Sequence, residues 1–261
     1  MADTDAVRGA GLPERLPAPP AAPEAAPEPG KVMTLVDHLT ELRTRIVRSV
    51  IAIALGTAIG FLAADRIKEI LVAPLPQSAL PLQFLSPGDG FAIQIRIAVV
   101  VGIVLAMPVL LYQLWSFISP GLTASERRAL RPWIPLALVF FVLGVSIAYI
   151  ILPFAMGFLL GFSDGTFQAR LAATPYIDFV TTMFLAFGLL MEFPIVLYAL
   201  ARIGILSSAR LRSSRRPIFL GIVIFAAVAT PGGDLVSPTV LATVMYLLFE
   251  ATVAVIRRGG R

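Results

Sequence analysis

The chain has 261 residues, of which 57% are hydrophobic and only 14% are charged. Soluble domains contain roughly 45–50% apolar and about 25% charged residues, so this composition excludes an ordinary soluble domain and indicates a polytopic membrane protein. The net charge of +5 comes from bases scattered in short groups between apolar runs, which favours loop charge over a nucleic-acid-binding stripe. The absence of cysteine excludes thiolate chemistry, and a single histidine, His38, argues against a multi-histidine metal site.

The N-terminal segment, residues 1–32, is rich in alanine, proline and glutamate. It has no apolar core of the kind that a cleaved signal peptide needs, and it cannot bury enough surface to fold. We therefore expect it to be a disordered tail.

The first membrane helix is predicted to begin at the membrane surface. Apolar residues recur at three and four positions from Leu35 to Ile46, opposite a polar stripe that contains Asp37, Glu41 and Arg45. This amphipathic helix continues into the apolar stretch Ile46–Ala64, which crosses roughly 28 Å at about 1.5 Å per residue.

The remaining apolar segments are separated by polar connectors. The predicted second, third and fourth spans are approximately Ile93–Phe117, Trp133–Phe162 and Ile177–Ala201, and their connectors include Asp65–Gly90, Ser163–Pro175 and the basic loop Arg202–Arg216. The next segment, Ile218–Ala229, covers only about 18 Å of helix and is too short for a ~30 Å hydrocarbon core. The last segment, approximately Val236–Ile256, is long enough to span.

The loop bases predict the orientation of the chain. Arginine and lysine concentrate on one side of the predicted spans, at residues 31, 43–48, 127–131, 202–216 and 257–261, whereas the other side has only Arg66, Lys68, Arg96 and Arg170. The positive-inside rule then places both termini in the cytoplasm, including the basic tail 257–261. Six spans satisfy this pattern, and so does a re-entrant hairpin over residues 218–256.

The loop after the second span contains a candidate binding residue, Glu126. Pro120 and Gly121 end the span, and Thr123 with Glu126 matches a capping box, which explains the spacing without any binding role. A capped carboxylate is also a good receptor for a guanidinium group. Both interpretations are compatible, because capping makes the carboxylate rigid.

Four other acidic residues have a structural and a functional interpretation. Glu41 stands four residues before Arg45, as in a helix ion pair, and it is a second cytoplasmic acid. Glu192 lies inside the fourth span, where a charge costs roughly 2.5–3.5 kcal/mol, so it is either a neutral bonded carboxyl or a functional group in a groove. Asp234 is predicted to be an exposed capping residue of a turn, and Glu250 an interfacial acid or the partner of an arginine.

Taken together, these motifs resemble the TatC family, the core subunit of the twin-arginine protein translocase. The resemblance covers residues 33–256 and rests on residues at the start of the first span, in the first external and internal loops, and in later spans: His38, Glu41, Arg43, Pro87, Phe91, Trp115, Pro120, Gly121, Glu126, Arg127, Gly144, Tyr149, Pro153, Glu192, Pro194, Pro231, Asp234 and Glu250.

The resemblance implies a fold and a function. The fold is an all-α, glove-shaped bundle of six transmembrane helices with short fifth and sixth spans, in a bacterial, archaeal or organellar membrane. The function is binding of the twin-arginine signal peptide of folded cargo, with Glu126 as the main partner of the arginines and with Glu41, Arg43 and Arg127 beside it. Glu192 becomes the acid of an intramembrane groove. The residues with structural roles are Pro87, Phe91, Pro120, Gly121, Thr123, Tyr149 and Asp234.

The resemblance also implies partners and an energy source. Single-span TatA- and TatB-type subunits and further copies of the chain assemble around it, and the proton-motive force drives transport without a cofactor or a chemical reaction. Three alternatives stay open at this point. One is a proton-coupled small-molecule carrier that uses Glu192, one is an intramembrane enzyme, for which no catalytic constellation is evident, and one is a purely structural subunit.

Overall fold

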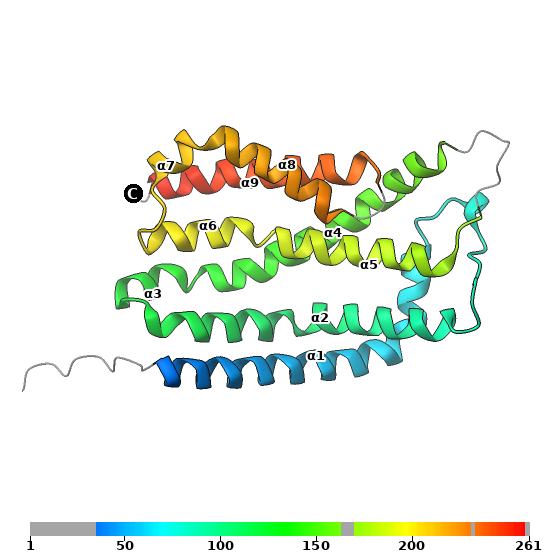
Figure 1. Ribbon diagram of the computed structural model, residues 1–261, viewed down its shortest axis with the longest axis horizontal. Coiled ribbons are helices and arrows are strands. Elements are labelled where there is room, and N and C mark those ends of the chain that lie inside the picture. The colour runs from blue at the N-terminus through cyan, green and yellow to red at the C-terminus, as the bar shows by residue number, and fades with distance from the viewer. Residues whose placement is uncertain (1–34, 163–169, 231–232, 259–261) are drawn as a thin grey trace, which may run out of the picture. The chain divides into compact units, whose positions relative to one another are not determined.

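The computed structural model describes residues 35–162, 170–230 and 233–258, which are all helices and short connections (Figure 1). The predicted tail at residues 1–32 and the end of the predicted tail 257–261 lie outside these ranges. The chain divides into two units, Met1–Leu39 and Thr40–Arg261. Of the first unit the described part begins helix α1, and all packing described below lies within the second unit.

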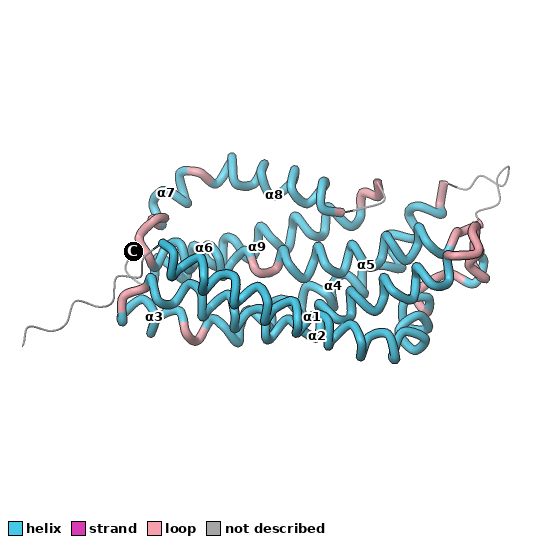
Figure 2. The backbone as a smooth tube through the Cα atoms, turned by 60° about the horizontal axis from the view of Figure 1, so that its bottom comes forward, coloured by secondary structure: helices cyan, strands magenta, loops and turns pink. Residues whose placement is uncertain are grey.

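Helices account for nearly all of the described chain. In Figure 2 the cyan helices are joined by short pink loops. Their bounds are α1 Leu35–Val72, α2 Asp89–Ile118, α3 Ala124–Leu130, α4 Trp133–Leu160, α5 Ala173–Leu190, α6 Phe193–Arg202, α7 Ser208–Ser213, α8 Arg215–Ala229 and α9 Val236–Arg258. Short 3-10 turns cover Gln77–Ala79 and Ser119–Gly121.

Five helical stretches in the described ranges are long and apolar enough to cross a membrane. They are His38–Val72, Asp89–Gly121, Ala124–Leu160, Ala173–Arg202 and Val236–Arg258. The sequence predicted six spans, and the segment that fails this test is α8, whose 15 residues cover only about 22 Å. The predicted shortness of the fifth span is thus confirmed, whereas α9, with 23 residues, is long enough to span.

Two predicted connectors are shorter than expected. In the connector predicted from Asp65, the sequence indicates a short amphipathic helix over Ile67–Val72, and the structure has it as the continuous end of α1. Ion pairs at helical spacing, Arg66–Glu69 at 2.9 Å and Lys68–Asp65 at 2.8 Å, support this extension. The connector predicted to end at Pro175 already gives way to α5 at Ala173.

Small residues bring α1 and α2 into close contact. A Cβ atom added to Gly56 would lie 2.6 Å from the carbonyl oxygen of Gly102, and one added to Gly60 would lie 2.7 Å from that of Ala98. Such close backbone approach is how membrane helices gain packing energy without help from water. The opposite face of α1 leaves apolar side chains such as Leu55, Ile59 and Leu62 exposed, as expected of a helix surrounded by lipid.

The buried core of the second unit lies among α2, α4, α5 and α9. Its largest fully buried side chains include Phe141, Phe187, Phe249 and Leu241. Gly144 on α4 permits a close contact, because a Cβ there would lie 2.4 Å from the carbonyl oxygen of Phe187 on α5. A hydrophobic core of this kind makes a rigid frame for the polar loops at its ends.

The elements that carry most of the bases gather at one end of these helices. Figure 1 shows α3, the connection from α6 to α7 and the C-terminal end of α9 at this end, together with the part of α1 that begins at Thr40. We call it the basic end. At the opposite end the connector after α1 meets the segment before α5, where Gln83 N–H donates to the Leu171 carbonyl at 3.0 Å and its carbonyl accepts from Ala173 N–H at 2.8 Å.

Candidate functional site

The loop between α2 and α3 holds Glu126 in a fixed position. Thr123 has extended backbone angles and precedes α3, and its hydroxyl oxygen accepts from the Glu126 N–H at 3.4 Å. The Glu126 carboxylate reaches back and accepts from the Thr123 N–H at 2.9 Å. The predicted capping box is therefore confirmed, and the half-buried carboxylate is rigid.

The rest of this loop is a tight turn that Arg127 braces. The 3-10 turn Ser119–Gly121 has Pro120 in its first positions, where the missing N–H costs nothing. Arg127 donates from Nη2 to the Ser119 carbonyl at 2.7 Å. Arg127 thus ties α3 to the end of α2, which is a structural role beside the binding role that the resemblance implies.

Glu41 lies in a chain of three polar side chains between α1 and α2. Its Oε1 is 3.0 Å from Arg45 Nη2, as the i,i+4 spacing predicts, and the two side chains are only 15% and 21% exposed. Arg45 Nη1 donates to Gln113 Oε1 on α2 at 3.1 Å, and Gln113 is 8% exposed. The other carboxylate oxygen of Glu41, Oε2, is buried and has no hydrogen-bond partner in the described part of the chain.

Sequence reasoning missed the role of Gln113. Gln113 belongs to the motif at the end of the second span that resembles the TatC family, but sequence spacing does not show that its partner is Arg45 on another helix. Arg43, by contrast, is exposed on α1 as an amphipathic helix requires. Glu41 and Glu126 come from different helices, and Figure 1 places both helices, from Thr40 onward, at the basic end.

Glu192 lies inside the fourth membrane-spanning stretch, Ala173–Arg202, as predicted, but at a break between two helices. The sequence predicted one span over Ile177–Ala201, but α5 ends at Leu190 and α6 begins at Phe193. Pro194 in the first turn of α6 explains the break, because it cannot donate to the preceding turn. The Glu192 carbonyl accepts from Ile195 and Val196, while its side-chain Oε1 is buried without a partner among the described residues.

Asp234 and Glu250 complete the set of predicted acids. The prediction that Asp234 is exposed is wrong, because it is only 4% exposed. Its capping role is confirmed, since Oδ1 accepts from the Ser237 N–H at 2.6 Å in the first turn of α9. Glu250 has the predicted arginine partner, Arg215 on α8 at 2.8 Å, and also accepts from the Tyr246 hydroxyl at 3.1 Å.

The predicted structural residues of the outer loops and α4 are placed as follows. Pro87 and Phe91 are exposed at the turn into α2, and no described interaction accounts for them. Tyr149 on α4 donates from its hydroxyl to the Ile70 carbonyl at 3.3 Å, so it anchors the end of α1. Gly121 has open space around its Cα atom.

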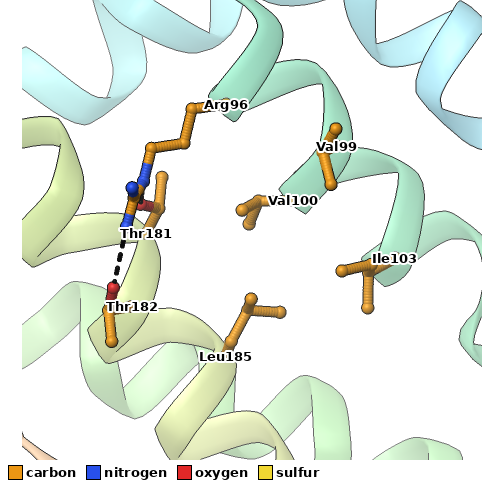
Figure 3. Close-up of a pocket in the computed structure, with 7 residues that line it drawn as sticks. All are labelled: Arg96, Val99, Val100, Ile103, Thr181, Thr182 and Leu185. Carbon is orange, nitrogen blue, oxygen red and sulfur yellow. Dashed lines mark hydrogen bonds between the residues drawn. The ribbon is translucent and has the colours of Figure 1, made fainter. Parts of the chain in front are cut away.

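A second polar cluster, which the sequence did not reveal, joins α2 to α5 within the apolar region (Figure 3). Arg96 forms an ion pair with Asp178 at 2.8 Å and donates to the hydroxyls of Thr181 at 3.0 Å and Thr182 at 3.1 Å. Beside it lies an open cavity of about 300 Å³, with Val99, Val100, Ile103 and Leu185 in its wall. The arrangement neutralises Arg96 and fastens two spans together.

Among the described residues, no group of three or more histidine, cysteine, aspartate or glutamate side chains could hold a metal ion. The candidate acids are single carboxylates, of which Glu41, Glu126, Asp234 and Glu250 are bonded to a backbone N–H or an arginine. Their chemistry suits the recognition of a cation such as a guanidinium group.

Comparison with known proteins identifies the family. Residues 37–243 match the family model of the Sec-independent protein translocase protein (TatC). The Sec-independent protein translocase protein TatC of Carboxydothermus hydrogenoformans is 35% identical over 85% of this chain and 92% of its own length. The protein of the same name from Aquifex aeolicus is 37% identical over 85% and 93%. The chloroplastic TATC protein of Pisum sativum is 31% identical over 88% of this chain and 66% of its own length.

Solved structures agree with these relatives. A crystal structure of the twin arginine translocase receptor TatC in the detergent DDM superimposes with a TM-score of 0.74 and 36% identity, covering 84% of this chain and 98% of that chain. A second crystal structure of the twin arginine translocase receptor TatC gives a TM-score of 0.73 at 37% identity. The chain therefore belongs to the TatC family of Sec-independent protein translocase proteins.

Proposed function

We propose that this chain is the twin-arginine signal peptide receptor and the core subunit of the Sec-independent translocase, which exports folded proteins. The observation that carries the proposal is the rigid Glu126 carboxylate. One of its oxygens is bound by the Thr123 N–H at 2.9 Å, and a carboxylate accepts further hydrogen bonds. A preorganised anion loses little entropy when a guanidinium binds.

Other residues of the basic end complete the proposed receptor. Glu41 is the second acid, and its buried Oε2 is an acceptor without a described partner. Arg43 is exposed on the same helix, where it contributes to the proposed peptide-binding surface, and Arg127 keeps the loop of Glu126 in place. Glu192, half-buried at the break between α5 and α6, is the proposed polar group of an intramembrane groove for the peptide's apolar segment.

We further propose a setting for this receptor. Residues 33–256 form the membrane domain, and the basic end faces the cytoplasm, since loop arginines favour that side. The N-terminus is then cytoplasmic, in the cytoplasmic membrane of a bacterium or a related membrane. The proposed partners are TatA- and TatB-type single-span subunits, further copies of this chain and folded cargo. The proton-motive force drives transport, and the chain itself catalyses no reaction.

The alternative of a proton-coupled small-molecule carrier is dropped. Its only support was the acidic residue Glu192 inside a span, whereas the relatives of this chain are translocase proteins. The comparisons give that alternative no support.

The proposal is tested by photo-crosslinking from a peptide with an arginine pair to the full chain in membranes. Glu126→Gln removes the charge but keeps a side chain suited to the capping box, and Thr123→Ala weakens the cap but keeps the charge. We expect Glu126→Gln to lose most of the crosslink to the arginine-pair peptide. We expect the same loss when wild type is given a lysine-pair peptide. Thr123→Ala should retain part of it. A full crosslink in Glu126→Gln would reduce this residue to its capping role.

A further inference from the structure

Arg45 divides its guanidinium group between two acceptors on different helices. Nη2 contacts Glu41 Oε1 at 3.0 Å, and Nη1 donates to Gln113 Oε1 at 3.1 Å. Each contact uses one nitrogen. Arginine and carboxylate commonly form two parallel hydrogen bonds instead, so this single contact requires a cause, and the position of Gln113 supplies it.

The consequence of the single contact is visible at Glu41. Its second oxygen, Oε2, is buried and has no hydrogen-bond partner among the described residues. A buried carboxylate oxygen without a partner is costly, and a bidentate Arg45 would remove that cost. Gln113 prevents this closure because it holds Nη1 on α2.

We propose that Gln113 is a positioning residue of the receptor: by holding Arg45 in a one-nitrogen contact, it keeps Glu41 Oε2 available for a guanidinium group of the signal peptide. This inference rests on the proposed function. Gln113 Oε1 already accepts from Arg45 Nη1 at 3.1 Å, so Gln113 acts through Arg45 and is not itself a ligand for the peptide.

The same geometry predicts what happens without Gln113. Nη1 of Arg45 then has no acceptor on α2 and turns to Oε2 of Glu41, only one helical turn away. The fork occupies both oxygens, and a peptide arginine must displace it. The lysine peptide loses less affinity, because its strongly hydrated ammonium binds a buried oxygen more weakly than a guanidinium does from the start.

The test measures affinities of the purified full chain in lipid nanodiscs for two synthetic peptides. One peptide carries an arginine pair followed by an apolar run, and the other carries a lysine pair at the same positions. The variants are Gln113→Leu, which removes the acceptor, and Gln113→Asn, which keeps an amide that is too short to reach Arg45. Monodisperse elution and thermal stability report that each variant is folded.

A matched control exists on the same pair of helices. Gln94 on α2 donates from Nε2 to the Phe61 carbonyl on α1 at 3.1 Å. Gln94→Leu therefore removes a glutamine bond between α1 and α2 far from Glu41. If Gln113 merely held the helices together, both leucine variants would weaken binding of both peptides alike.

We expect Gln113→Leu and Gln113→Asn to weaken binding of the arginine peptide by about tenfold, and thereby to lower the arginine-to-lysine preference. Gln94→Leu should change the affinity for the arginine peptide by less than about twofold. In an Arg45→Gln background, Gln113→Leu should have little further effect, because the residue through which it acts is gone.

The outcomes separate the inference from the proposed function. If wild type does not prefer the arginine peptide, the proposed function fails. If wild type does prefer it, the inference is overturned when the Gln113 variants bind like wild type, bind more tightly, or lose both peptides equally. Persistence of the Gln113→Leu effect in the Arg45→Gln background also overturns it.

Discussion

Replacing Gly102 by alanine tests whether close contact between α1 and α2 is essential. An added Cβ would lie 2.4 Å from Thr57 Oγ1, 2.6 Å from Thr57 N and 2.8 Å from Thr57 Cα. The hydroxyl can rotate away, but the backbone of α1 cannot. Since ordinary contact begins near 3.4 Å, α1 must retreat by about 0.8 Å.

The expected cost is that of overpacking, roughly 1–3 kcal/mol. At about 2–4 °C per kcal/mol for a chain of this size, the melting temperature should fall by roughly 2–12 °C. The retreat of α1 also moves Arg45 away from Gln113. The hydrogen bond from Arg45 Nη1 to Gln113 Oε1 already measures 3.1 Å, so it should lengthen and weaken. The arginine-peptide affinity should therefore fall along with the stability.

Gly157→Ala is the matched control. Gly157 is also inside a helix, but an added Cβ meets nothing within 4 Å. The variant should be neutral or more stable, by up to about 1 kcal/mol from helix propensity. Thermal unfolding of both variants in the same detergent, followed by size exclusion, makes the comparison. Gly102→Ala that melts at or above Gly157→Ala would refute the close packing of α1 on α2.

Three further predictions concern the polar residues. Arg96→Met should lower the free energy of unfolding by roughly 1–3 kcal/mol, because Asp178 then lacks its cation, and adding Asp178→Leu should recover most of the loss. Denaturant titration of the single and double variants measures this. A double variant whose loss equals the sum of the two single losses would contradict the pairing. Glu192→Leu should stabilise the protein by about 1–3 kcal/mol, since it removes a buried oxygen without a described partner; a lower melting temperature in detergent would show this reasoning to be wrong. Thr123→Ala should cost about 1 kcal/mol of local helix stability, so a protease should cleave this variant faster at α3. It should cleave the Thr123→Ser variant at the wild-type rate.

The sequence by itself determined the features that depend on neighbouring residues. Apolar runs and helical periodicity located the spans, and the capping box of Thr123 and Glu126 follows from a three-residue spacing. The Glu41–Arg45 pair follows from a four-residue spacing. These features are local because a helix brings residues three and four apart onto one face, so any chain with the same segment would show them.

Only the tertiary structure decided which distant polar groups meet. Gln113 lies 68 residues from Arg45, and Thr181 lies 85 residues from Arg96. Neither contact has a signal in sequence spacing, because each depends on how two helices pack. The burial of Asp234, which is only 4% exposed, is likewise absent from a sequence pattern that is polar at this turn. The local pattern thus located the acids, and packing determined which side chains they meet and which of their oxygens are buried.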